Sequence, residues 1–139
     1  EEYVIRNPLA AEEDGSLAFA APIAAGTEVR LMIGSKEKTL EAARIAAEDL
    51  VASFQSNNAA LGLILIFEGV ARKKLLGALA MDEINAILDI TGRDIPLCGI
   101  ASYGEFGPVV HPVGGIQASD PTLFNNGTIT IVGVGTRRG

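Results

Sequence analysis

The chain is poor in cysteine, histidine and aromatic residues, and each shortage excludes a class of site. It has one Cys, one His and no Trp among 139 residues, and aromatic residues make up 5% of it. A single cysteine cannot form an internal disulfide, and the chain lacks the Cys/His cluster that a structural zinc site needs. We read His111, which could ligate a metal or a haem iron, as a loop residue. We therefore expect no cofactor.

A basic surface and long apolar segments are also lacking. Acidic residues outnumber basic ones by 17 to 11, which gives a net charge of -6. Nucleic acids and anionic membranes attract basic faces, so we expect neither as a partner. The longest apolar run, residues 61–67, is too short to span a bilayer, and no signal peptide opens the chain. These features favour a cytoplasmic protein.

A hydrophobic content of 48% is enough to build a core. The length then favours one domain spanning residues 1–139. Because the sequence begins at Glu1 without an initiator methionine, we expect a piece excised from a longer polypeptide.

Hydrophobic periodicity predicts an alternation of strands and helices. Strands are expected at residues 3–6, 17–20, 28–33, 61–67, 97–103 and 128–134, and helices between 35 and 56, at 70–78 and at 82–91. The first two strands can pair as an antiparallel edge, and residues 109–124 read as a long loop. We therefore predict an α/β fold, with a mixed β-sheet, helical crossovers and an antiparallel edge. The alternative is an α+β two-layer sandwich.

The connections between strands predict where polar groups meet. Residues 61–67 are apolar at nearly every position, as in a central strand covered on both faces. The strands ending at residues 33, 67 and 103 are joined by helical connections, so they should run parallel and end at one edge of the sheet. The last strand, if it returns antiparallel beside residues 97–103, begins at that same edge.

Open sheets with helical crossovers bind ligands at such an edge. The candidate ligand-binding residues are Glu68, Arg72, Ser102, Tyr103, Gly104, Glu105, Asn126 and Thr128. Simpler roles remain open for each of them. Glu68 and Arg72 can form a salt bridge within one helical turn, Tyr103 can pack its ring, and Asn126 can serve only as a turn residue.

The chain resembles the C-terminal domain of the FIST family, the F-box and intracellular signal transduction domain. The resemblance rests on residues spread over essentially the whole chain: Tyr3-Val4-Ile5-Arg6, Gly26-Thr27-Glu28-Val29-Arg30-Leu31-Met32, Leu63 to Phe67, Ala71-Arg72, Leu76-Gly77, Pro96, Cys98-Gly99, the run from Ser102 to Pro108, Asn126 and Thr128. The Tyr-Gly-Glu turn followed by a final Asn-x-Thr strand is its most specific part. The chain departs from the family at Glu68, where similar domains often have a small residue or a cysteine.

The resemblance implies a small-ligand-binding sensory domain of an intracellular signal-transduction protein. The implied partners are an N-terminal FIST domain or a downstream signalling protein, together with an amino acid or a related metabolite as ligand. Glu68 or Glu105 would then take an ammonium, Arg72 a carboxylate, and Asn126 or Thr128 would fix orientation. Some members of the family are described as haem-based gas sensors, which keeps a haem-linked role as a further alternative.

Two other classes of function stay open. An enzyme could use Glu105 as general base and Tyr103 as acid, but the sequence shows no nucleophile–base–orienter set, so we expect no catalysis. A protein-interaction or adaptor module without a small ligand could use residues 107–124 as its contacting surface.

Overall fold

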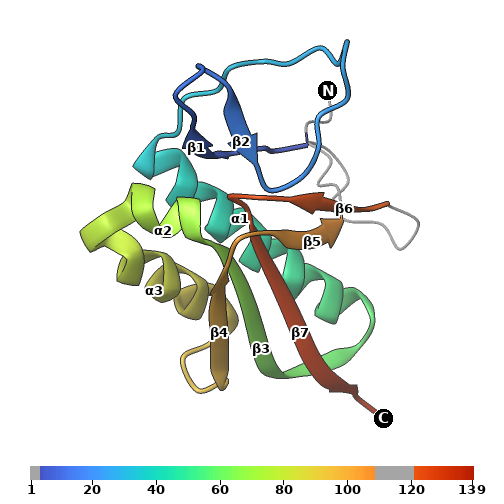
Figure 1. Ribbon diagram of the computed structural model, residues 1–139. Coiled ribbons are helices and arrows are strands. Elements are labelled where there is room, and N and C mark those ends of the chain that lie inside the picture. Colours follow the sequence, from blue (N-terminus) through green and yellow to red (C-terminus); the bar gives the residue numbers. More distant parts are fainter. Residues whose placement is uncertain (1–3, 109–120) are drawn as a thin grey trace.

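The computed structural model describes residues 4–108 and 121–139 of the chain (Figure 1). In chain order the elements are β1 (Pro8–Ala11), β2 (Leu17–Phe19), α1 (Lys36–Ser56), β3 (Ala59–Gly69), α2 (Val70–Leu76), the 3-10 turn η1 (Gly77–Leu79), α3 (Ala80–Thr91), β4 (Leu97–Ser102), β5 (Glu105–Pro108), β6 (Thr122–Asn125) and β7 (Ile129–Arg137). The predicted α/β class, with a mixed sheet, helical crossovers and antiparallel pairs, is confirmed. Within the described ranges, none of the helices combines the length and the apolar character needed to cross a membrane.

The main sheet has the strand order β4-β3-β7. The apolar run predicted as a central strand is β3, which pairs parallel with β4 and antiparallel with β7. The crossover from β3 to β4 passes through α2 and α3, as expected for parallel neighbours. The final strand thus lies beside β3, whereas the sequence placed it beside residues 97–103. Its beginning still reaches the predicted edge, because Ile129 pairs with Glu68.

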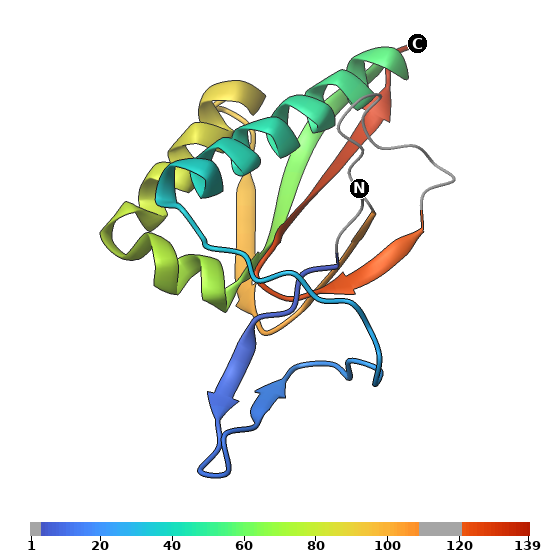
Figure 2. The ribbon, with the colours of Figure 1, turned by 90° about the horizontal axis from the view of Figure 1, so that it is seen from above.

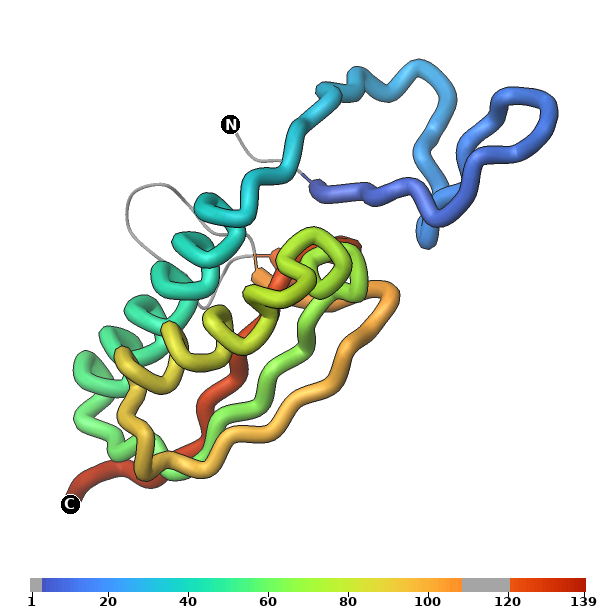
Figure 3. Tube along the Cα trace, turned by 90° about the vertical axis from the view of Figure 1, so that its left-hand side faces the viewer, coloured from blue at the N-terminus to red at the C-terminus, as the bar shows by residue number. Residues whose placement is uncertain are grey.

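The helices cover one face of this sheet (Figure 3). Ile64 and Ile66 of β3 are buried against Ala43, Ala47 and Ile87, which come from α1 and α3. The two alanines are fully buried, and their small side chains let α1 lie close to the sheet. From Leu63 onward, the opposite face carries the odd-numbered residues of β3, and the expectation that both faces of this strand are covered holds less well there. Phe67 on that face is 37% exposed.

The helix ends follow ordinary capping chemistry. The Ser35 side chain accepts a hydrogen bond from the Lys38 backbone N–H at the start of α1. Gly92 closes α3 with a φ of 110°, a left-handed conformation that glycine adopts without steric cost.

The strand predicted at residues 28–33 is wrong. The structure describes these residues and shows no strand there, and Leu31 and Ile33 are 96% and 92% exposed. Alternation of charged and apolar side chains is necessary for a half-buried strand, but a strand also needs a neighbouring edge to pair with. Two parallel strands, β3 and β4, therefore end at the predicted edge instead of three.

The predicted antiparallel pairing of two N-terminal strands is confirmed, but its first strand lies later in the chain than predicted. Residues 4–6 form no strand; the partner of β2 is β1, which begins at Pro8 (Figure 2). The reason lies in the hydrogen bonds of the preceding segment. The Ile5 backbone N–H donates to Asn125 Oδ1 at 2.9 Å, and the Ile5 carbonyl accepts from the Asn126 N–H at 3.2 Å. This segment is held against the β6–β7 turn and is not available to β2.

Part of the predicted long loop is a strand. Residues 122–125 form β6, which pairs antiparallel with β5 and packs Phe124 against Phe106 at 5.2 Å between ring centroids. The rest of that loop, residues 109–120 with His111, lies outside the described residues.

Candidate functional site

Glu105 is the fixed centre of the predicted edge. It is the first residue of β5, directly after the short turn that follows β4, and its side chain is buried, with 2% of the residue exposed. Oε1 accepts a hydrogen bond from the Ser102 hydroxyl at 2.9 Å. Oε2 accepts from the Thr128 hydroxyl at 2.9 Å and from the Thr128 backbone N–H at 3.2 Å. One carboxylate thereby joins the end of β4 to the start of β7.

Asn126 makes a second set of ties across the same region. It is buried, and its side-chain Nδ2 donates to the Tyr103 carbonyl at 3.3 Å. Its Oδ1 accepts from the Asn7 backbone N–H, and the Asn7 amide donates to the Asn126 carbonyl. The N-terminal segment, the turn after β4 and the β6–β7 turn are thus held together by two asparagines.

Two glycines allow these segments to approach closely. A Cβ placed on Gly69, the last residue of β3, would lie 2.7 Å from the Gly127 Cα and 3.1 Å from Glu105 Oε1. Gly127 also has a φ of 96°, which disfavours any residue with a side chain. At predicted site residue Gly104, a Cβ would overlap the Phe124 ring. The site can therefore pack this closely only because these positions are glycines.

A recess of about 260 Å³ opens beside these contacts. It is lined by Asn7, Pro8, Leu9, Val70, Ala71, Lys74, Ser102, Tyr103, Asn126 and Gly127. We call it the Tyr103 recess. Tyr103 is 69% exposed at its margin, and among the described lining residues Lys74 alone carries a charge. Its neutral polar groups are two amides, a hydroxyl and a phenol, all of which can form hydrogen bonds to a small molecule.

The structure brings together six of the eight predicted residues. Ser102, Tyr103 and Asn126 line the Tyr103 recess, while Glu105 and Thr128 lie behind it as its support and Gly104 sits in the turn between.

Glu68 and Arg72 belong to a separate cluster and do not line the recess. Arg72 is buried, forms an ion pair with Glu83 of α3, and donates from Nη2 to the Thr39 carbonyl of α1 at 2.8 Å. Glu68 pairs in the sheet with Ala101 and Ile129, and its pKa is raised, first by burial and then by the charge of Glu83.

Sequence reasoning missed three polar or charged side chains of these two sites. Asn7 and Lys74 line the recess, and Glu83 holds Arg72. The signal for Glu83 was present, since it lies one helical turn before Ile87 on the apolar face of α3, where a carboxylate needs a partner. No comparable pattern marks Asn7, whose role depends on a turn 119 residues away.

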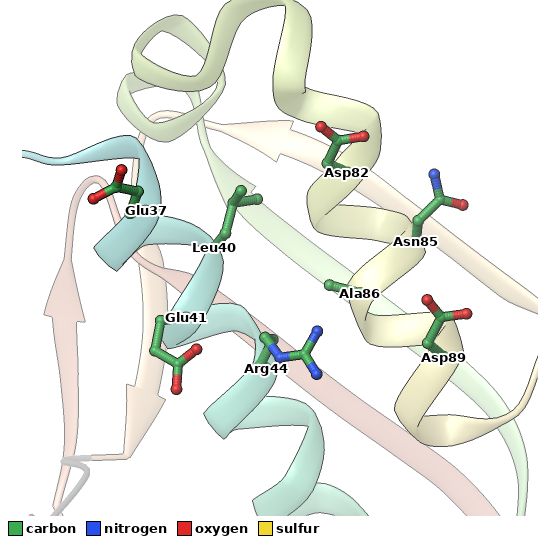
Figure 4. A pocket seen from close by; sticks show the side chains of 8 residues that line it. All are labelled: Glu37, Leu40, Glu41, Arg44, Asp82, Asn85, Ala86 and Asp89. Carbon is green, nitrogen blue, oxygen red and sulfur yellow. The ribbon is translucent and has the colours of Figure 1, made fainter.

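A second recess, of about 350 Å³, lies between α1 and α3. Figure 4 shows Leu40 and Arg44 pointing from α1 toward α3, with Asp82 and Asp89 on the facing helix. None of the predicted site residues lines it. Asp89 already pairs with Arg93 at 2.6 Å. We therefore interpret the charged residues of this recess as solvent-exposed side chains of two helices and not as a binding site.

Comparison with known proteins finds a match to the FIST C domain over residues 1–108. That range includes Ser102, Tyr103 and Glu105, and it ends before Asn126 and Thr128. No curated protein and no solved structure matches the chain. Because the family match covers more than half of the sequence, the chain belongs to the FIST C domain family, whose domains are associated with signal transduction.

Proposed function

We propose that this domain senses a small molecule by binding it in the Tyr103 recess. The observation that supports the proposal is the way the recess is built. Buried hydrogen bonds of Glu105 and Asn126 fix its floor, while Tyr103 and Lys74 stay exposed at its margin. A rigid floor with accessible polar groups above it is the arrangement that lowers the entropic cost of binding.

The ligand class that suits these groups is an amino acid or a related carboxylate-bearing metabolite. Lys74 supplies the cation for a carboxylate, and the hydroxyls of Ser102 and Tyr103 supply neutral oxygens for an amine. The sequence assigned the ligand's charges to Glu68, Glu105 and Arg72. Arg72 has Glu83 as its partner, Glu105 accepts three hydrogen bonds, and Glu68 lies outside the recess, so Lys74 takes their place in the proposal.

A thermal-shift screen tests the proposal. The panel consists of the common amino acids, each paired with its deaminated carboxylate and its decarboxylated amine. A ligand that binds only the folded state raises the melting temperature. We expect carboxylate-bearing members to do so in the wild type and to lose most of the shift in Lys74→Gln. Lys73→Gln is the matched control, because Lys73 is an exposed neighbour on α2 outside the recess. A panel without any shift, or shifts that survive Lys74→Gln unchanged, would contradict the proposal.

An adaptor role is the second candidate, and the exposed apolar surface favours it. Ile100 of β4 is 62% exposed on the sheet face opposite the helices, and Val132 and Val134 lie on that same face. Apolar surface of this kind often marks a contact with another protein. The proposed partner is an N-terminal FIST domain or a downstream signalling protein. Isothermal titration with a separately produced N-terminal FIST domain tests this role, with Ile100→Asp expected to weaken binding.

We further propose that the domain works without a cofactor, does not catalyse a reaction and resides in the cytoplasm. Both carboxylate oxygens of Glu105, the candidate general base, are engaged by hydrogen bonds from Ser102 and Thr128, which supports a structural role for this side chain. The exposed thiol of Cys98 suits a reducing compartment.

A further inference from the structure

Beneath α2, two buried charged side chains, Arg72 and Glu83, meet the partly buried Glu68. Glu83 of α3 is fully buried, and Arg72 of α2 is 8% exposed. Glu68, the penultimate residue of β3, lies on the same sheet face as the core residues Ile64 and Ile66. Arg72 pairs with Glu83 and also binds the Thr39 carbonyl. The cluster therefore joins β3 and all three helices of the sheet's covered face.

The hydrogen bonds of this cluster are incomplete when both carboxylates are ionised. Glu68 Oε1 and Glu83 Oε2 are buried without a hydrogen-bond donor among the described residues, and the Nε–H of Arg72 is buried without an acceptor. Two carboxylates share the Arg72 guanidinium: Glu83 is fully buried, and Glu68 is partly exposed with Lys73 as the other nearby cation. Burying an unpaired charge is costly, and buried acids avoid that cost by keeping a proton.

We propose that Glu68 and Glu83 share one proton, and that this proton fixes the position of α2 and so the shape of the Tyr103 recess. Glu83 remains the ionised member, because Arg72 is its ion-pair partner. Glu68 is the protonated member, and its O–H donates to Glu83, which satisfies both carboxyl groups. The cluster is therefore a proton-binding site. It is distinct from the proposed ligand site, because it can hold its proton whether or not a ligand occupies the Tyr103 recess.

The surroundings of Glu68 are consistent with a retained proton. Its pKa is raised by burial first, then by the charge of Glu83 and by a hydrogen bond with Glu83. Lys73 and Arg72 of α2 act in the opposite direction and more weakly. Its sheet neighbours in β4 and β7 are Ala101 and Ile129, which carry no charge. From α1 the group that reaches the cluster is the neutral carbonyl of Thr39.

One short helix connects the cluster to the recess. Arg72 lies on the buried side of α2, while Val70, Ala71 and Lys74 of the same helix line the Tyr103 recess. Loss of the shared proton would put two negative carboxylates together in the interior. The least costly response is for Glu68 to turn outward, which displaces the start of α2. The protonated and ionised forms of Glu68 then correspond to two positions of α2, and so to two shapes of the Tyr103 recess.

Carboxyl-carbon NMR of the protein labelled with ¹³C at glutamate tests the shared proton. In the wild type, we expect the Glu68 carboxyl to keep its proton above the ordinary glutamate range. The backbone amides of Ala71 and Gly127, at the recess, should shift with the same midpoint. In Glu68→Gln that transition should disappear, while Glu48→Gln, an exposed glutamate on α1, should retain it.

Each contrary outcome overturns a defined part of the proposal. A Glu68 carboxyl that titrates at or below its ordinary value would overturn proton sharing. A raised midpoint that Ala71 and Gly127 do not follow would overturn the coupling to the recess. Both tests use the wild type, so they hold even if Glu68→Gln folds poorly.

The pH dependence of stability gives an independent check. Because the folded-state pKa of Glu68 lies above its unfolded value, the contribution of the retained proton is complete below the ordinary glutamate pKa. It is lost as the pH rises through the raised value. The urea midpoint of the wild type should therefore fall over that interval, and the fall should be smaller in Glu68→Gln. A wild-type midpoint that stays flat or rises there would contradict the shared proton.

Discussion

Glu105 Oε2 accepts two hydrogen bonds from Thr128, one from the hydroxyl at 2.9 Å and one from the backbone N–H at 3.2 Å. Residues 23 positions apart in the chain are thereby joined at the edge where β4 ends and β7 begins. The sequence marked Glu105 as a candidate ligand-binding group, because it follows a strand that ends at the predicted edge. Its contacts make it a positioning residue for the Tyr103 recess.

Replacing Glu105 should therefore lower stability. Glu105→Ala leaves the Ser102 and Thr128 donors buried without an acceptor, and we expect a loss of about 3 kcal/mol in the free energy of unfolding. Glu105→Gln keeps one acceptor oxygen but turns an amide N–H₂ toward a donor, so its cost should be smaller. Urea denaturation measures both. Glu48→Gln, on the exposed side of α1, should change stability by less than about 0.5 kcal/mol. Equal effects at the two glutamates would refute the positioning role.

The contact between Gly69 and Gly127 predicts a position-specific cost within one strand. Gly69→Ala places a methyl group 2.7 Å from the Gly127 Cα, and overpacking against backbone should cost about 1 to 3 kcal/mol. Gly62→Ala is the matched control in β3, since its Cβ would lie 3.6 Å from the Val134 carbonyl oxygen, an ordinary contact distance. Thermal and urea unfolding of the two variants compare them directly. A Gly69→Ala variant as stable as Gly62→Ala would show that the end of β3 and the turn at Gly127 can move apart at little cost.

Removing Arg72 should destabilise the fold by leaving Glu83 without its partner. Breaking a buried ion pair on one side typically costs about 3 to 5 kcal/mol, so Arg72→Met should fall in that range. The double variant Arg72→Met/Glu83→Met should recover much of the loss, because it removes both buried charges. Lys73→Met, at the exposed neighbouring position, serves as control. The ion-pair role fails if Arg72→Met unfolds at the same urea concentration as Lys73→Met.

Tyr103→Phe should separate ligand binding from stability. The phenol is at the exposed margin of the recess, so deleting its oxygen should change the free energy of unfolding by less than about 0.5 kcal/mol. In the thermal-shift screen, however, the ligand-induced rise in melting temperature should shrink, because one hydrogen-bonding group is lost. A full ligand-induced shift in Tyr103→Phe would place the phenol outside the binding contacts.

Local sequence patterns were sufficient to predict those helices and strands whose formation depends mainly on their own composition. The apolar run that became β3, the helix between residues 35 and 56 and the helix that ends at residue 91 were all predicted. Each depends on hydrophobic burial or on backbone hydrogen bonds within a few residues, which the sequence displays directly. The parallel arrangement of β3 and β4, which end at one edge, followed from the crossover rule.

Side-chain partners, in contrast, depended on how the elements pack. Arg72 stands one helical turn after Glu68, and the sequence could equally make them a salt bridge or a pair of ligand contacts; the packing of α3 brought Glu83 to Arg72 instead. Likewise, residues 28–33 have the alternation of a strand but no edge to pair with in the structure. By itself, then, the sequence determined which segments are apolar enough to form the covered sheet and its helices, because burial is a property of each segment. Only the tertiary structure decided which charges neutralise one another and which polar groups stay open to a ligand, because those choices are made between residues far apart in the chain.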